Sequence, residues 1–123
     1  MDLPTFKLRV GQRLGVVPVA GSLDASDGEL VTSAYELLVH ELTEHSLAWW
    51  DATGNVPDEY ADIMVGMTAA RLIDDFTIAE PRRSQLLMQS AFGLPVASVD
   101  ERRLRRLLSN KADPDAAETD RYF

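Results

Sequence analysis

The longest run without a helix-breaking residue constrains the fold of this chain most. It extends from Glu29 to Trp50 with neither proline nor glycine. Ser26, with Glu29 three residues later, forms a capping box that predicts the helix start. Apolar residues follow in two lines at helical spacing, Val31, Tyr35, Leu38, Leu42 and Trp49 in one, and Leu30, Ala34, Leu37 and Ala48 beside it. We expect a helix over 26–50, about 35 Å long, whose wide apolar face packs against the rest of the fold.

Four further helices are predicted from apolar spacing and capping residues, over 5–14, 57–76, 81–92 and 98–108. Gly15 ends the first helix in the left-handed conformation, and Ser98 with Glu101 forms a second capping box. The small residues Gly66, Ala69 and Ala70 would let their helix approach the long helix closely. No strand pattern occurs. The prediction is a compact all-α bundle of about five helices over 1–108, with one long central helix, and a polar, disordered C-terminal arm over 109–123.

Composition excludes several classes of function. The 123 residues, of which 46% are hydrophobic and 26% charged, suffice for one globular domain. The net charge of −8 disfavours non-specific binding of nucleic acid. The absence of cysteine excludes disulfides and thiolate metal sites. The chain shows no signal-peptide pattern and no run long enough to cross a bilayer, so we expect neither export nor membrane insertion.

The segment from His40 to His45, HELTEH, invites comparison with the helix of a zinc protease. That motif needs two histidines four residues apart, but here they are five apart and point about 140° from one another around the helix. The pairs that share a face are His40 with Glu44 and Glu41 with His45, which favours ordinary i,i+4 helix pairs over a metal site. No serine lies in a nucleophile pattern, and no phosphate-binding loop occurs. We therefore expect no enzyme activity, cofactor or metal.

The last predicted helix has an apolar side of leucines and a basic side. The basic side consists of Arg102, Arg103, Arg105 and Arg106. Three interpretations are open. The favoured one is a side that is solvated or paired within the chain; the second is pairing with an acidic surface of another subunit, because arginine favours bidentate contacts with carboxylates. Contact with DNA phosphates comes last, because the rest of the acidic surface would repel the duplex.

Two aromatic pairs stand outside the predicted core pattern. Trp49 and Trp50 end the long helix, and because adjacent residues cannot both face the core, one of them is expected to be partly exposed or held by a neighbour. Tyr122 and Phe123 end the polar arm, where they add nothing to the core of a monomer. They are either anchors for a pocket on a partner or part of an idle tail.

The order of these parts resembles that of a known protein family. A short helix ends in RLGVV at 13–17, an acidic linker leads to the long helix that ends in tryptophan, and VPDEY at 56–60 opens the helix that ends in AARL at 69–72. Over residues 6–92 this arrangement is similar to the head-to-tail adaptors of tailed bacteriophages, also called tail accessory factors or packaged-DNA stabilisation proteins.

The resemblance implies a structural protein of the virion, located in the neck after assembly in the bacterial cytoplasm. Copies of such an adaptor form a homo-oligomeric ring, typically of twelve, beneath the portal protein. The ring extends the DNA channel, through which the packaged genome passes without sequence-specific binding. It also helps to retain the genome and receives the next tail or nozzle protein.

The resemblance further implies that the C-terminal arm reaches the portal. The residues expected to contact the portal are then Asp120, Arg121, Tyr122 and Phe123. The residues expected at contacts with subunits or other partners are Trp49, Trp50 and the four arginines of the last helix. One function of another class stays open, a small acidic cytoplasmic helical module that regulates or binds a basic partner.

Overall fold

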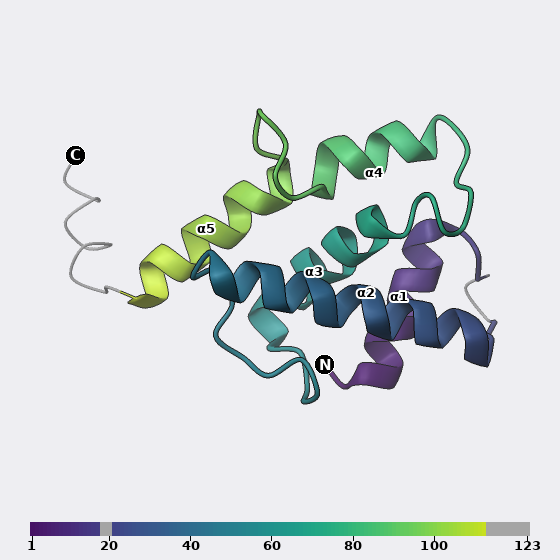
Figure 1. The fold of residues 1–123 in the computed structure, drawn as a ribbon, viewed down its shortest axis with the longest axis horizontal. Helices are drawn as coiled ribbons and strands as arrows, with labels where there is room; N and C mark the ends of the chain where they lie inside the picture. The colour runs from purple at the N-terminus through teal and green to yellow at the C-terminus, as the bar shows by residue number, and fades with distance from the viewer. Residues whose placement is uncertain (18–20, 113–123) are drawn as a thin grey trace.

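The computed structural model describes residues 1–17 and 21–112, with side chains as far as Ser109. Figure 1 shows that these residues form helices joined by loops, and no strand occurs among them. The predicted all-α fold is confirmed. The five helices of the described chain are α1 (Leu3–Leu14), α2 (Ala25–Glu44), α3 (Asp58–Arg71), α4 (Arg82–Ser90) and α5 (Val99–Ala112).

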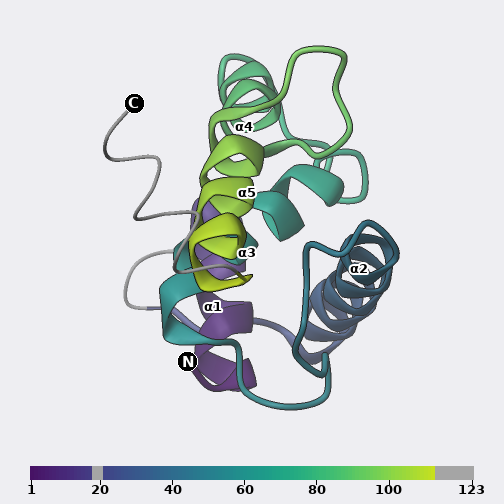
Figure 2. The same cartoon turned by 90° about the vertical axis from the view of Figure 1, so that its left-hand side faces the viewer.

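Helix α3 is the centre of the fold, which corrects the prediction that the long helix is central. It contacts all four other helices, whereas α2 packs on α1 and α3, and α4 packs on α5 and α3. Figures 1 and 2 show α2 on one side of α3 and the α4–α5 pair on another. Every residue of α3 from Tyr60 to Ala70 is buried except Asp62. A helix that is apolar nearly all round must be enclosed by its neighbours.

Helix α2 ends at Glu44, earlier than predicted, because Ser46 adopts the left-handed conformation with φ of 59°. The Ser46 N–H donates to the carbonyl of Thr43 at 3.0 Å, and the Leu47 N–H donates to the carbonyl of Leu42 at 2.7 Å. These two bonds form a Schellman motif, and the two leucines are both buried in the core. A serine at the position where glycine is usual concealed this helix end from sequence analysis.

The start of α2 also differs from the predicted capping box. Asp24 is the N-cap, and its Oδ1 accepts a hydrogen bond from the Ala25 N–H at 2.9 Å. The Ser26 hydroxyl donates to the other oxygen of Asp24 at 2.8 Å instead of capping the helix. An aspartate accepts the same bond as a serine and also carries charge at the positive end of the helix.

Only one of the two predicted apolar lines of α2 is buried. Its large buried residues are Val31, Tyr35, Leu38, Val39 and Leu42. In the neighbouring line, Leu30 is 42% exposed and Leu37 is 61% exposed. The prediction of a wide buried face is therefore wrong, because α2 packs on its neighbours through a single stripe.

Of the ends of α1, α3 and α5, the first agrees with the prediction and the other two differ from it. Gly15 ends α1 with φ of 81°, as predicted. After Arg71 the predicted continuation of α3 becomes a series of turns, closed at Thr77 with φ of 51°. Helix α5 continues to Ala112, beyond the predicted end at Leu108 and into the predicted arm.

The loop after α2 returns Trp50 to the core. Its indole Nε1 donates to the Tyr35 hydroxyl at 2.9 Å, and its ring stacks on Tyr60 with centroids 5.1 Å apart. Trp49 is largely exposed and meets Trp50 edge-on, so one indole is held and the other exposed, as their adjacency predicts. Burial raises the pKa of Tyr35, more than the hydrogen bond from Trp50 lowers it.

Replacing Tyr35 with Phe should destabilise the fold by about 1 kcal/mol, because the partly buried N–H of Trp50 loses its acceptor. Tyr60→Phe is the matched control: the Tyr60 hydroxyl is buried and has no hydrogen-bond partner among the described residues. That variant should unfold within about 0.5 kcal/mol of wild type, or be more stable. Urea unfolding measures both free energies. Equal losses in the two variants would contradict the assigned hydrogen bond.

Tyr35 should also make the protein sensitive to alkali. Its pKa in the fold lies above the ordinary value of 10.0, so the unfolded chain loses this proton first. The contribution of protonated Tyr35 to the free energy of unfolding is therefore fully present below about pH 10 and is lost as the pH rises further. Urea unfolding at about pH 9 and about pH 11 should show a smaller alkaline loss in Tyr35→Phe than in wild type. An identical loss would show that Tyr35 does not carry this dependence.

Candidate functional site

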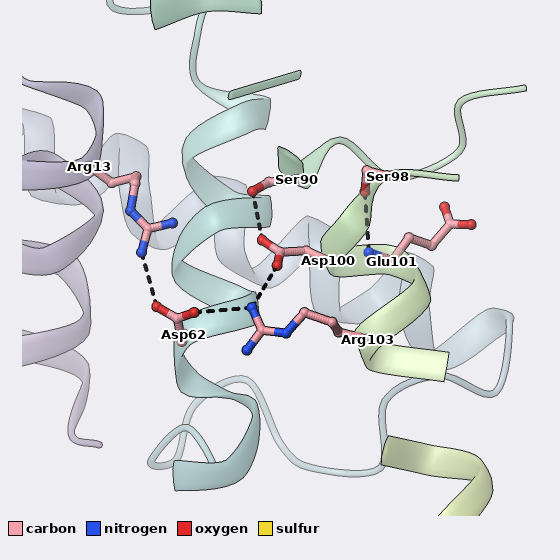
Figure 3. Close-up of polar contacts among 7 residues, drawn as sticks. All are labelled: Arg13, Asp62, Ser90, Ser98, Asp100, Glu101 and Arg103. Carbon is pink, nitrogen blue, oxygen red and sulfur yellow. Dashed lines mark hydrogen bonds and ion pairs between the residues drawn. The ribbon is translucent and has the colours of Figure 1, made fainter. Parts of the chain in front are cut away.

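A buried carboxylate joins the last two helices (Figure 3). Asp100, in the first turn of α5, is 1% exposed. The hydroxyl of Ser90, at the end of α4, donates to its Oδ2 at 2.7 Å, and Arg103 Nη1 donates to its Oδ1 at 3.1 Å. An unpaired carboxylate would be costly at this depth. The Ser90–Asp100 bond therefore fixes α4 and α5 relative to one another, and the Arg103 bond lies within α5.

The same network continues through α3 to α1. Arg103 Nη1 lies 3.3 Å from Asp62 Oδ2, and Asp62 Oδ1 accepts from Arg13 Nη2 at 3.0 Å. In Figure 3 the two acids and two arginines alternate from α5 across α3 to α1. Asp62 and both arginines are at least a third exposed, so solvent screens their pairs. The buried end at Asp100 holds the elements together, and the exposed end orients Arg13.

Gly66 on α3 provides the space for this network. A Cβ at Gly66 would lie 2.5 Å from Ser90 Oγ and 2.6 Å from Asp100 Oδ2. Both distances are shorter than van der Waals contact allows, so no larger residue fits without separating the helices. The predicted role of Gly66 in a close approach to α2 is wrong, because its open side faces α4 and α5.

The connection between α4 and α5 is tied down by Glu101. Ser98 Oγ accepts from the Glu101 N–H at 3.2 Å, which confirms the serine half of the predicted capping box. The acid half differs, because Glu101 Oε1 accepts from the Gly93 N–H at 2.9 Å. Gly93 has φ of 87°, which favours glycine at this turn. The loop over 93–98 is thus fixed to the first turn of α5.

An apolar groove of about 1080 Å³ lies along α4, this loop and the start of α5. Met88 is 73% exposed and Val96 is 83% exposed, and such a patch marks an interaction surface. Sequence analysis missed the groove, although the apolar run LPVA at 94–97 between two helices was a signal of it. The other apolar residues that line it are Leu86, Leu94, Pro95, Ala97 and Val99, and the polar ones are Arg13, Arg82, Gln85, Gln89 and Arg102.

The four arginines predicted on one side of the last helix divide into two pairs. Arg103 joins the network described above, and Arg105 Nε lies 3.5 Å from Glu101 Oε2. The favoured interpretation, pairing within the chain, is confirmed for these two. Arg102 and Arg106 are exposed and form no ion pair with any residue that the structure describes. Of these, Arg102 lines the groove.

The histidine segment contains one of its two predicted pairs. His40 Nε2 lies 3.2 Å from Glu44 Oε1, as predicted. Glu41 pairs instead with Arg71 of α3 at 2.6 Å. The predicted Glu41–His45 pair is wrong, because His45 lies beyond the last turn of α2. Its ring packs edge-on against Phe92, just after the end of α4. Among residues 1–17 and 21–112, no three potential metal ligands come together.

The remaining predicted contact residues are only partly described. Trp49 presents an exposed ring, whereas Trp50 is partly buried and packs against the core. The arm residues Asp120, Arg121, Tyr122 and Phe123 lie outside the residues that the structure describes. Within the described chain, no helix combines the length and the apolar character needed to cross a membrane.

Comparison with known proteins identified no relative of this chain. No protein-family model, no curated protein and no solved structure matched it. Function is therefore inferred from the residues and surfaces described above.

Gly66→Ala should lower the free energy of unfolding by about 2 kcal/mol, because the methyl group overpacks the buried Ser90–Asp100 pair. The sign is diagnostic, since glycine to alanine inside a helix otherwise stabilises by up to about 1 kcal/mol. Gly28→Ala on α2 is the matched control, because its Cβ would make only ordinary contacts, the nearest at 3.8 Å. Thermal or urea unfolding compares the two variants, and a Gly66→Ala protein as stable as Gly28→Ala would contradict this packing.

Proposed function

We propose that this protein is a head-to-tail adaptor of a tailed bacteriophage, a structural protein that binds the portal and acts without catalysis. Its copies form a ring that extends the DNA channel, helps to retain the genome and holds the next tail component in the virion neck. The order of parts over 6–92, the all-α fold and the exposed apolar groove support this proposal.

The groove is the observation that carries the proposal. Met88, Leu94, Val96 and Val99 stay exposed to water although the Asp100 network holds the surrounding helices firmly. Covering such a surface gains roughly 25 cal/mol for each Å² of apolar area. The lining contains no Ser, Thr, Cys, Tyr, Lys, His or acid, and these are the side chains that usually supply a nucleophile or a general acid or base. The groove therefore suits assembly with another protein surface better than a reaction.

Charge supports the same function. A channel through which DNA slides should not hold its phosphates, and a net charge of −8 disfavours such binding. The arm carries four acids in its last eleven residues, DPDAAETDRYF, and ends in two aromatic residues. We assign Tyr122 and Phe123 to a pocket on the portal, with the acids and Arg121 beside them.

The portal experiment compares the full chain with one that ends at Ala112, where α5 ends. Mass measurement of each protein mixed with the portal of the same phage should show a stoichiometric ring for the full chain only. Tyr122→Ala combined with Phe123→Ala should act like the shortened chain, because the anchors are lost. Thr119→Ala, in the same arm, is the control and should bind like wild type.

Two other outcomes would change the assignment. If the shortened chain forms the ring as well as the full chain, the arm is not the portal contact. If neither chain binds the portal, the adaptor function is wrong. The protein would then be assigned to the other class, a small acidic helical module that binds a basic partner.

A further inference from the structure

The exposed face of α2 combines leucines with unpaired acids. Leu30 and Leu37 lie two turns apart on one line of the helix, about 10 Å along its axis. Glu29 and Glu36 lie one position before each leucine and are also exposed. Neither acid forms an ion pair with a residue that the structure describes, unlike Glu41, which is paired with α3. This face is thus apolar along one line and negatively charged along its flank.

The groove is also apolar but carries charge of the opposite sign. Seven of its lining residues are apolar, and Met88 and Val96 are the most exposed of them. Arg82 and Arg102 lie among its lining residues, and neither has an ion-pair partner within the described chain. The third arginine, Arg13, is held by Asp62. The groove therefore offers, beside apolar surface, two arginines that form no ion pair within the described chain.

We propose that these two surfaces bind each other between copies of this chain. The leucines of α2 in one copy enter the groove of the next copy, while Glu29 and Glu36 pair with Arg82 and Arg102. The two surfaces lie on different sides of α3 (Figure 2), so one copy can use both at once, each with a different neighbour. A contact of this head-to-tail kind continues from copy to copy and closes into a ring when the rotation allows.

Contacts between two identical surfaces are disfavoured by charge. Two α2 faces would bring Glu29 and Glu36 against the same acids of the partner, and two grooves would bring arginines together. Only the mixed contact covers apolar surface on both sides and pairs opposite charges. This inference rests on the proposed function only for the closure of the copies into a ring beneath the portal.

Disulfide trapping tests the contact directly, because the chain has no cysteine of its own. Leu37→Cys and Val96→Cys replace side chains that are 61% and 83% exposed, so both variants should fold. Mixing the two proteins at high concentration under mild oxidation should give a crosslinked dimer of one Leu37→Cys and one Val96→Cys chain. Mixing Val96→Cys with Asn55→Cys, an exposed position outside both surfaces, is the control and should give much less.

Charge exchange separates this contact from random collision. Glu36→Arg in the Leu37→Cys protein should reduce the yield of the mixed dimer about tenfold. Adding Arg102→Glu to the Val96→Cys protein should restore it. Predominant crosslinking of Leu37→Cys with itself, or of Val96→Cys with itself, would overturn the proposal. A mixed yield no higher than the Asn55→Cys control would also overturn it.

The two proposals fail in different experiments. Trapping uses the protein without the portal, whereas mass measurement with the portal tests the adaptor function. A ring on the portal without the mixed crosslink would leave the adaptor function standing and refute this interface. The mixed crosslink without portal binding would support the interface and refute the adaptor function.

Discussion

The buried carboxylate of Asp100 is the constraint on which the arrangement of the last two helices depends. It needs hydrogen-bond donors away from water, and Ser90 and Arg103 supply them from α4 and α5. Ser90 and Asp100 can meet there only because Gly66 leaves α3 without a side chain at that point. The walls of the apolar groove are the same two helices. One buried polar contact therefore fixes the shape of the surface that we assign to assembly.

Helix periodicity predicted the existence of the elements but not which of them is central. The buried line of α2 and the glycine end of α1 follow rules that local sequence carries. The end of α2 does not, because Ser46 takes a conformation that glycine usually provides. The central position of α3 also escaped prediction, because it depends on how many neighbours cover a helix. A wide apolar pattern does not reveal whether its second line, here Leu30 and Leu37, is covered.

The candidate site shows the same division between local and distant information. The Ser98 cap and the His40–Glu44 pair join residues a few positions apart, and sequence analysis found both. The Asp62–Arg103 contact joins α3 to α5, so no local pattern could show it. The groove likewise arises where separate elements meet. Its charge complementarity with α2 became visible only when the pairing of each arginine and acid was known.

The central claim is that the Ser90–Asp100 contact couples α4 to α5, and native-state hydrogen exchange of Ser90→Ala tests it most directly. Without the hydroxyl, Asp100 loses a donor at a cost of about 1–3 kcal/mol. The amides of α4 and α5 should lose protection together, while those of α2, which packs on α1 and α3, keep theirs. Loss of protection in α4 alone, or an equal loss in all five helices, would contradict the claim.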